Sequence, residues 1–169
     1  MSRAFVNEDA GKDRPDLPEL PVSPHPNVVT PRGLRALRAR LEARRADLTA
    51  LRARADRLDK LPEAAAERDI RWLEARIGSA IVSDPASRPL TEVAFGLRVR
   101  VVDEGGRESW YEITGEDEAD ATLGRIAPHA PLARALLGAQ VGDEVTWRRP
   151  SGAMMLEVLE VLEIARADP

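Results

Sequence analysis

Two apolar stripes with heptad spacing limit residues 31–82 to very few folds. Such spacing places apolar side chains along one face of a helix. The stripes must be covered, and two helices with a short break between them do this by folding back antiparallel. The sequence therefore predicts a helical hairpin. The stripes consist of Leu34, Leu37, Leu41, Leu48, Leu51, Ala55 and Leu58, then Ala66, Ile70, Leu73, Ile77 and Ala80.

The signals for helix ends agree with this hairpin. Thr30-Pro31 offers an N-cap followed by a proline in the first helical turn. Pro62 disfavours helix at Leu61 and can open a second helix, which places the turn near residues 59–62. Arg44 fills the one vacancy in the first stripe. A single helix kinked at Pro62 is the competing interpretation, and it leaves both stripes exposed unless a partner covers them.

After residue 92 the apolar period becomes that of strands. Leu97, Val99 and Val101 alternate with arginines, and a glycine turn at 104–106 leads to a second strand at 109–114. Residues 131–137 predict a short helix that Gly138 ends. Strands follow at 144–148 and 155–164. The prediction is an α+β chain, in which an antiparallel sheet with one short helix follows the hairpin.

Proline content marks the remaining segments. Residues 1–29 carry prolines at about every third position from Pro15 on, which predicts a flexible tail. Residues 83–92 read as a linker. The expected organisation is a tail at 1–29, a hairpin at 30–82, a linker at 83–92 and a β domain at 93–164.

Composition narrows the class of protein. The chain has no cysteine, which excludes disulfides, zinc fingers and thiol catalysis. No apolar run approaches the roughly 18 residues of a membrane span, and the first residues do not resemble a signal peptide. We therefore expect a soluble, cytoplasmic protein with no membrane partner.

Charge is unevenly spread along the chain. Residues 31–84 hold 13 Arg/Lys and 9 Asp/Glu, whereas residues 90–169 hold 8 and 15. A basic stripe on the first predicted helix either contacts RNA or a polar wall, or simply solubilises the hairpin. Its members are Arg35, Arg38, Arg45, Arg52 and Arg57.

The order of short motifs in residues 93–162 resembles the C-terminal domain of the Gre transcript-cleavage factors, GreA and GreB. The matching pieces are Phe95-Gly96, Gly115 to Asp120, Ile126, Pro131, Ala135 to Gly138, and Val141-Gly142-Asp143. One departure is Ala130, where the family often has a serine that caps the short helix. The resemblance implies an N-terminal coiled-coil hairpin and an FKBP-like C-terminal domain.

The resemblance also implies a role in transcription elongation and its regulation, together with DNA binding. Gre factors bind the RNA polymerase core and insert the coiled coil into its secondary channel. Tip carboxylates there share Mg²⁺ with the polymerase and promote hydrolysis of the RNA 3′ end in backtracked complexes. The implied protein is a monomer that binds no cofactor stably. Pro131 and Leu132 are the expected polymerase-binding residues.

Asp56 and Asp59 best match the family's tip pair, as catalytic residues and Mg²⁺ ligands. Their i, i+3 spacing would place both on one helix face. The ordinary alternative is that both acids are solvated or ion-paired. The family's tip glycine and asparagine are absent, and the hairpin is shorter by about one heptad per helix, or roughly 10 Å. These departures favour a regulator that does not cleave efficiently.

Two further functions stay open at the sequence level. An FKBP-like fold could act as a peptidyl-prolyl isomerase, although the domain has few aromatic residues to line a pocket. The hairpin could also serve as a scaffold or dimerisation module. A metal site at His25 or His129 is not expected, because no third ligand stands near either histidine in the sequence.

Overall fold

The computed structural model describes residues 17–55, 59–83 and 90–164. Contacts divide this chain into two compact units. One unit contains the described residues up to Pro24 together with Leu37–Gly78. The other contains His25–Ala36 and the chain from Ser79 on. Helix α1 is therefore a continuous element whose first turns belong to the second unit.

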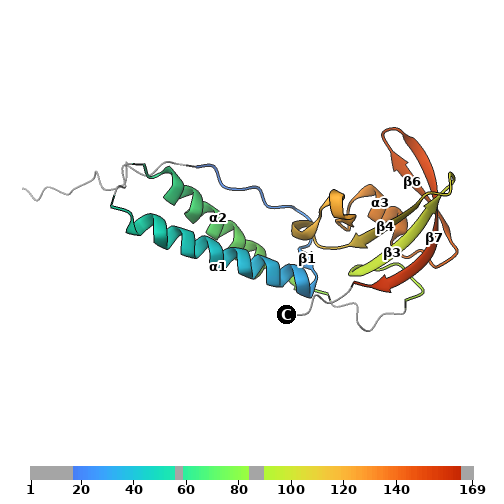
Figure 1. Cartoon of the computed structure of the whole chain (residues 1–169), viewed down its shortest axis with the longest axis horizontal. Coiled ribbons are helices and arrows are strands. Elements are labelled where there is room, and N and C mark those ends of the chain that lie inside the picture. The colour runs from blue at the N-terminus through green and yellow to red at the C-terminus, as the bar shows by residue number, and fades with distance from the viewer. Residues whose placement is uncertain (1–16, 56–58, 84–89, 165–169) are drawn as a thin grey trace, which may run out of the picture. The chain divides into compact units, whose positions relative to one another are not determined.

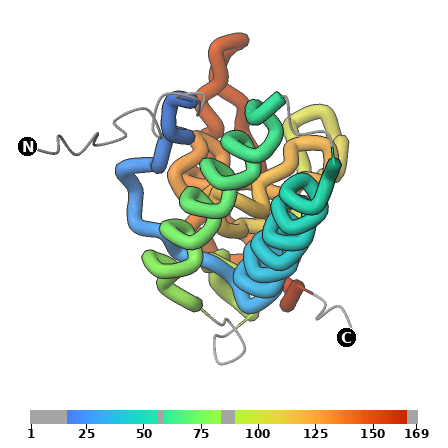
Figure 2. Tube along the Cα trace, turned by 90° about the vertical axis from the view of Figure 1, so that its left-hand side faces the viewer, coloured from blue at the N-terminus to red at the C-terminus, as the bar shows by residue number. Residues whose placement is uncertain are grey.

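Two antiparallel helices form the first unit, as predicted. Helix α1 spans Pro31–Ala53 and helix α2 spans Leu61–Gly78 (Figure 1). They lie side by side in Figure 2. Three ion pairs join the two helices, and Arg52, the latest of the three arginines in α1, pairs with the earliest of the three acids in α2. These pairs are Arg45–Glu74 at 2.9 Å, Arg44–Asp69 at 2.9 Å and Arg52–Glu67 at 2.7 Å.

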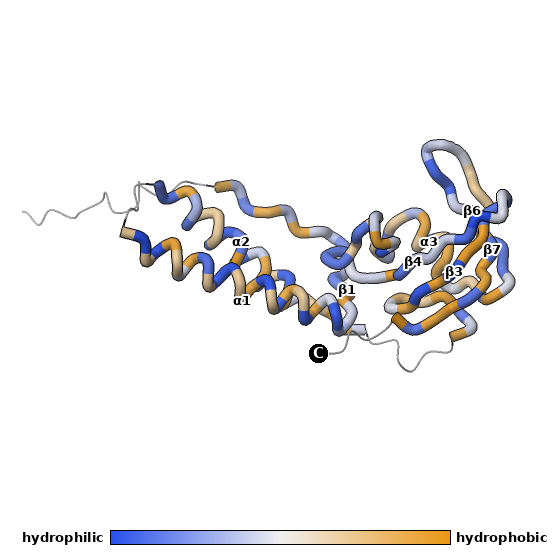
Figure 3. The backbone as a smooth tube through the Cα atoms, viewed as in Figure 1, coloured by the Kyte–Doolittle hydropathy of each residue, from blue (hydrophilic) through white to orange (hydrophobic). Residues whose placement is uncertain are grey.

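The apolar stripes supply the buried residues of the hairpin. Leu37, Leu41 and Leu48 of α1 are buried, as are Ala66 and Leu73 of α2. Hydrophobic positions recur along both helices in Figure 3. The vacancy in the first stripe has a structural use, because the guanidinium of Arg44 reaches both Asp47 on its own helix and Asp69 on α2.

Residues 17–24 contact α2. The Trp72 indole Nε1 donates to the Pro21 carbonyl oxygen at 3.1 Å, and Arg71 pairs with Glu19. This segment runs along α2 in Figure 1. Residues 1–16 of the predicted tail lie outside the described residues. The flexibility of the tail and the boundaries of the tail, hairpin, linker and β domain stay predictions.

A five-stranded sheet forms the second unit, in the order β5-β4-β3-β7-β6. Its neighbouring strands are antiparallel except for the parallel β4–β5 pair. Helix α3 is Pro131–Leu136. The α+β class is confirmed. The strands are β3 (Leu97–Asp103), β4 (Glu108–Ile113), β5 (Arg125–Ile126), β6 (Glu144–Arg149) and β7 (Gly152–Glu163).

One apolar core joins α3 to the sheet. Alternation along β3 buries Leu97, Val99 and Val101, all at most 1% exposed. Leu136 of α3 and Ile113 of β4 join them and are fully buried. The strand period predicted from the sequence thus identifies the buried face correctly.

A second, two-stranded sheet was not predicted. Strand β1 (Val28–Val29) pairs in parallel with β2 (Ile81–Val82). Backbone bonds from Ile81 N to Asn27 O at 2.8 Å and from Ser83 N to Val29 O at 3.0 Å complete the pairing. The chain just before α1 and the chain just after α2 are therefore joined within the second unit.

Among the helices in the described part of the chain, none has the length and apolar character needed to cross a membrane.

Leu136 and Leu137 offer a matched test of the core, because they are adjacent and differ in burial. Leu136 is fully buried, whereas Leu137 is 37% exposed. Leu136→Ala should lower the free energy of unfolding by about 2–5 kcal/mol through lost burial and a residual cavity. Leu137→Ala should change it by less than about 1 kcal/mol. Denaturant unfolding measures both, and equal losses would contradict the assigned core.

Candidate functional site

The motif loop of residues 115–120 holds the first turn of α1. The carboxylate of Glu118 accepts hydrogen bonds from the Thr30 hydroxyl, with oxygen–oxygen distances of 2.7 and 2.8 Å. It also accepts one from Arg32 Nε at 3.2 Å. The Glu118 side chain is only 6% exposed. These contacts join residues more than 80 positions apart in the sequence.

Thr30 links the loop to the helix because its hydroxyl both donates and accepts a hydrogen bond. Its Oγ1 accepts from the Gly33 backbone N–H at 2.9 Å, as an N-cap does, and donates to Glu118. The predicted cap is therefore present. The negative charge of Glu118 also stands beside the positive end of the α1 dipole, where it is favourable.

Arg32 extends this group onto the sheet. Its guanidinium pairs with Glu112 of β4 at 3.0 Å, and Glu112 also pairs with Arg125 of β5 at 3.3 Å. Burial works against the charged guanidinium, but hydrogen bonds and charge from Glu112 and Glu118 outweigh it and raise the pKa of Arg32. We name Thr30, Arg32, Glu112 and Glu118 the anchor cluster.

Two glycines allow the loop and the helix to approach this closely. A Cβ on Gly33 would lie 2.4 Å from the Glu118 carboxyl carbon. A Cβ on Gly115 would lie 2.8 Å from the Val28 carbonyl oxygen. Larger residues at either position would push the anchor cluster apart.

Asp120 closes the other end of the motif loop. Its carboxylate accepts from the hydroxyl of Thr122 at 2.6 Å and from the Thr122 backbone N–H at 2.9 Å. Those bonds stabilise the charged form and lower the pKa of Asp120. Asp120 thereby acts as the N-cap of the short 3₁₀ turn Ala121–Leu123.

The two predicted polymerase-binding residues differ in exposure. Pro131 begins α3 and is exposed, whereas Leu132 is 5% exposed and belongs to the core. Ala130 is the N-cap of α3 and offers no side-chain hydrogen bond, as expected from its departure from the family pattern. Pro131 is thus the member of the pair whose side chain a partner can reach.

Of the predicted tip pair, the structure describes Asp59 alone. Asp56 lies outside the described residues. Asp59 is exposed and lies after the end of α1 at Ala53, and one of its carboxylate oxygens accepts from the Leu61 backbone N–H at 2.9 Å. Asp59 therefore does not lie on α1, and the role of Asp56 and Asp59 as a tip pair stays a prediction. Asp59 instead helps to begin α2.

Two of the four described arginines of the basic stripe are engaged within the hairpin. Arg45 pairs with Glu42 and Glu74, and Arg52 pairs with Glu67. Arg35 and Arg38 are exposed and have no ion-pair partner among the described residues. Arg57 lies outside them. Among the described members of the stripe, the two earlier arginines are therefore the ones that offer an unpaired charge.

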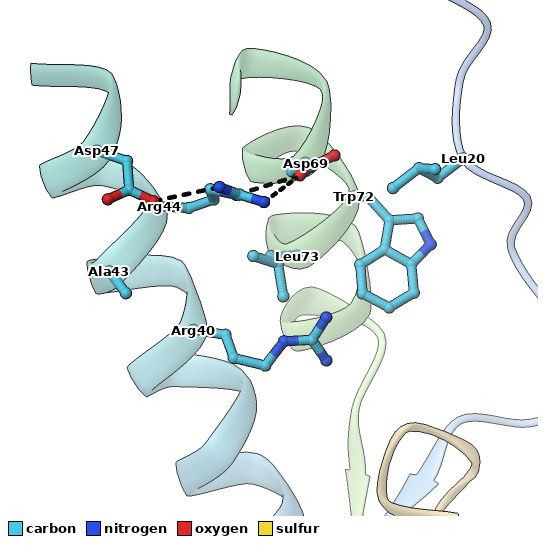
Figure 4. Close-up of a pocket in the computed structure, with 8 residues that line it drawn as sticks. All are labelled: Leu20, Arg40, Ala43, Arg44, Asp47, Asp69, Trp72 and Leu73. Atoms are coloured by element: carbon cyan, nitrogen blue, oxygen red, sulfur yellow. Dashed lines mark hydrogen bonds and ion pairs between the residues drawn. The ribbon is translucent and has the colours of Figure 1, made fainter. Parts of the chain in front are cut away.

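A pocket of about 330 Å³ lies on the first unit. Figure 4 shows Arg40, Trp72 and Leu20 around it, and the Arg40 guanidinium lies 5.8 Å from the Trp72 ring centroid. Arg44, Asp47 and Asp69 form a paired charge group at one side. Residues 17–24 contribute Leu20 to the lining.

A second polar cluster gathers the only two histidines of the chain with Glu116. Nδ1 of His129 lies 3.1 Å from Oε1 of Glu116, and the His25 ring stacks on the His129 ring. The expectation that no third ligand lies near either histidine is wrong. The fold brings together three segments that the sequence separates by about 90 and 13 residues.

The sequence did not predict the anchor cluster, although it identified the two segments that form it. Thr30-Pro31 was identified as a helix start and Glu118 as part of the motif, but sequence spacing gives no sign that they touch. Pairing across 88 residues needs the folded domain.

Removing the Glu118 carboxylate should destabilise the second unit. Glu118→Ala leaves the Thr30 hydroxyl and the Arg32 guanidinium without their acceptor, at a cost of about 1.5–3 kcal/mol. Glu104→Ala is the matched control, since Glu104 is an exposed acid in the β3–β4 turn. Denaturant unfolding compares the two. A Glu118→Ala loss no larger than that of the control would contradict the anchoring role.

Removing the Thr122 hydroxyl should raise the pKa of Asp120. Because the folded pKa is depressed, Asp120 stabilises the fold above the ordinary aspartate pKa of about 3.9 and loses this effect as the pH falls through the folded pKa. Thr122→Val should bring the pKa back toward its ordinary value. Carboxyl ¹³C NMR titration measures it, and an unchanged pKa would show that the hydroxyl has no part in the shift.

The match to a known protein family lies within the second unit. Residues 88–163 match the family model described as "Transcription elongation factor, GreA/GreB, C-term". GreA of Alkalilimnicola ehrlichii is 43% identical over 94 residues, covering 54% of this chain and 60% of that protein. GreB of Neisseria meningitidis is 41% identical over 96 residues, covering 56% and 59%. The chain thus spans less than two thirds of the length of these curated relatives.

Two solved structures are also similar. The GreA/GreB protein from Nitrosomonas europaea is 25% identical with a TM-score of 0.41, covering 80% of this chain and 98% of that one. The Gfh1 protein of Thermus thermophilus is 23% identical with a TM-score of 0.38, covering 81% and 99%. Residues 88–163 are thus similar to the C-terminal domain of the GreA/GreB transcription elongation factors.

Proposed function

We propose that this chain regulates bacterial transcription elongation by binding core RNA polymerase and placing its helical hairpin in the secondary channel. The family of the C-terminal domain supports the partner. The anchor cluster supports the use of the hairpin, because the motif carboxylate of Glu118 holds the first turn of the helix that forms the hairpin. A partner that binds the domain therefore also holds the start of α1 through this contact.

In this proposal Pro131 contacts the polymerase directly. It is exposed at the start of α3, and the buried Leu132 holds that helix in the core from beneath. Arg35 and Arg38 supply the positive charge that the hairpin offers to RNA or to the channel wall. Arg45 and Arg52 are left out of this role because acids of the hairpin already pair with them.

We further propose that regulation does not depend on efficient transcript cleavage. Mg²⁺ takes oxygen ligands and usually needs one or two carboxylates besides substrate oxygens. Within residues 59–67, Asp59 alone offers an exposed carboxylate, since Glu63 is buried and Glu67 is half-buried and paired with Arg52. Asp59 also uses one oxygen to cap α2. This part of the tip does not complete a Mg²⁺ site by itself.

Retention on immobilised core polymerase tests the binding proposal. The wild-type chain should be retained, and Pro131→Glu should lose most of this retention because it puts a charge at the contact. Pro150→Glu is the matched control, as Pro150 is another exposed proline, in the β6–β7 turn. Circular dichroism checks that both variants fold. Failure of the wild-type chain to bind would overturn the proposal and leave a scaffold or dimerisation role.

A cleavage assay on backtracked elongation complexes tests the second part. We expect the wild-type chain to bind these complexes with little Mg²⁺-dependent shortening of the RNA. Asp56→Ala/Asp59→Ala should then behave like the wild type. Rapid shortening that the double variant abolishes would instead assign cleavage to Asp56 and Asp59. Turnover of a prolyl peptide by the purified chain would favour the isomerase alternative.

A further inference from the structure

We propose that His25, Glu116 and His129 form a binding site for a divalent cation of the zinc class. One ligand atom from each residue lies within 4.8 Å of the other two. Zinc prefers histidine nitrogen and cysteine sulfur as ligands. The chain has two histidines and no cysteine, and both histidines are in this cluster. The site lies within the second unit and is separate from the hairpin tip.

The spacing of two of the ligands is already close to that of a metal site. Nδ1 of His129 and Oε1 of Glu116 are 3.1 Å apart. A tetrahedral ion with bonds of about 2.1 Å holds its ligand atoms about 3.4 Å from one another. The ion could therefore enter between these two atoms with little backbone movement.

The third ligand needs a side-chain rotation. The rings of His25 and His129 stack with centroids 4.4 Å apart and planes inclined by 15°. Nearly parallel rings direct their nitrogen lone pairs side by side and not toward one point, so one ring must turn. Both histidines are exposed, which leaves room for that rotation.

The backbone that carries the ligands is restrained. Prolines flank His25 on both sides, and His129 follows Pro128 in a turn closed by a bond from Ala130 N to Ala127 O at 3.0 Å. Glu116 begins the 3₁₀ turn Glu116–Glu118, which the anchor cluster holds through Glu118. Restrained ligands lose less entropy when they bind.

The ligand types select the metal. Two imidazoles and one carboxylate suit Zn²⁺ and similar borderline ions, whereas Mg²⁺ and Ca²⁺ prefer oxygen ligands throughout. Three protein ligands leave a fourth position for water. The simpler use of the same groups is an ion pair between Glu116 and protonated His129 with no metal, and the test separates the two uses.

Binding would tie residue 25 to two loops of the sheet domain. An ion that binds only the folded arrangement stabilises it by mass action. Zinc should therefore raise the thermal stability of the second unit. This inference does not depend on polymerase binding.

Isothermal titration of the full, untagged chain with zinc chloride tests the site. We expect one Zn²⁺ per chain, unaffected by excess Mg²⁺. His25→Ala, His129→Ala and Glu116→Gln should each weaken binding by at least about tenfold, since even outer-shell changes commonly cost that much. Glu104→Gln, in an exposed turn away from the cluster in sequence, is the matched control and should bind as the wild type does.

NMR of the wild-type chain supplies a second readout that needs no variant. Side-chain ¹⁵N resonances of both histidines should shift together and saturate at one equivalent of zinc. The proposal is overturned if the wild-type chain binds no zinc at one equivalent, if only one imidazole responds, or if a folded His25→Ala/His129→Ala variant binds zinc as tightly as the wild type.

Discussion

Glu118 places a nearly buried carboxylate against the first turn of α1, and the start of the hairpin depends on that contact. The Thr30 hydroxyl, the Arg32 guanidinium and the dipole of α1 all favour its negative charge. Such charge-assisted bonds are stronger than neutral ones, and leaving one partner buried alone is costly. The glycines at 33 and 115 are needed because any side chain there would occupy the space of this contact. A family motif that reads as a turn in the sequence is thus the point at which the β domain holds the helix.

The hairpin itself is held together by hydrophobic burial more than by charge. Its buried leucines keep α1 and α2 together through the hydrophobic effect, which has no preferred direction. The ion pairs across it join side chains that are mostly about half-exposed, so they contribute little free energy and mainly fix the register. Two of these pairs engage Arg45 and Arg52 of the basic stripe, so the charge of those two arginines is already balanced within the hairpin.

The sequence predicted elements whose side chains repeat with a clear period. The heptad stripes identified both helices, and the alternation from Leu97 to Val101 identified β3 and its buried face. Strands β1 and β2 were missed because two residues carry no period. Pro62 correctly placed the turn near Asp59, but the helix face expected for Asp59 is absent because α1 ends at Ala53. The anchor cluster and the histidine cluster are contacts between distant segments, and only the fold brings their members together.

We propose that this chain binds RNA polymerase and that its hairpin enters the secondary channel. Site-specific photo-crosslinking tests it most directly. A photoreactive residue in place of the exposed Arg54, one residue beyond the end of α1, should crosslink to polymerase subunits that line the secondary channel. Excess unmodified chain should suppress the product. Crosslinks confined to the outer surface of the polymerase, or none in a complex that forms, would contradict the account.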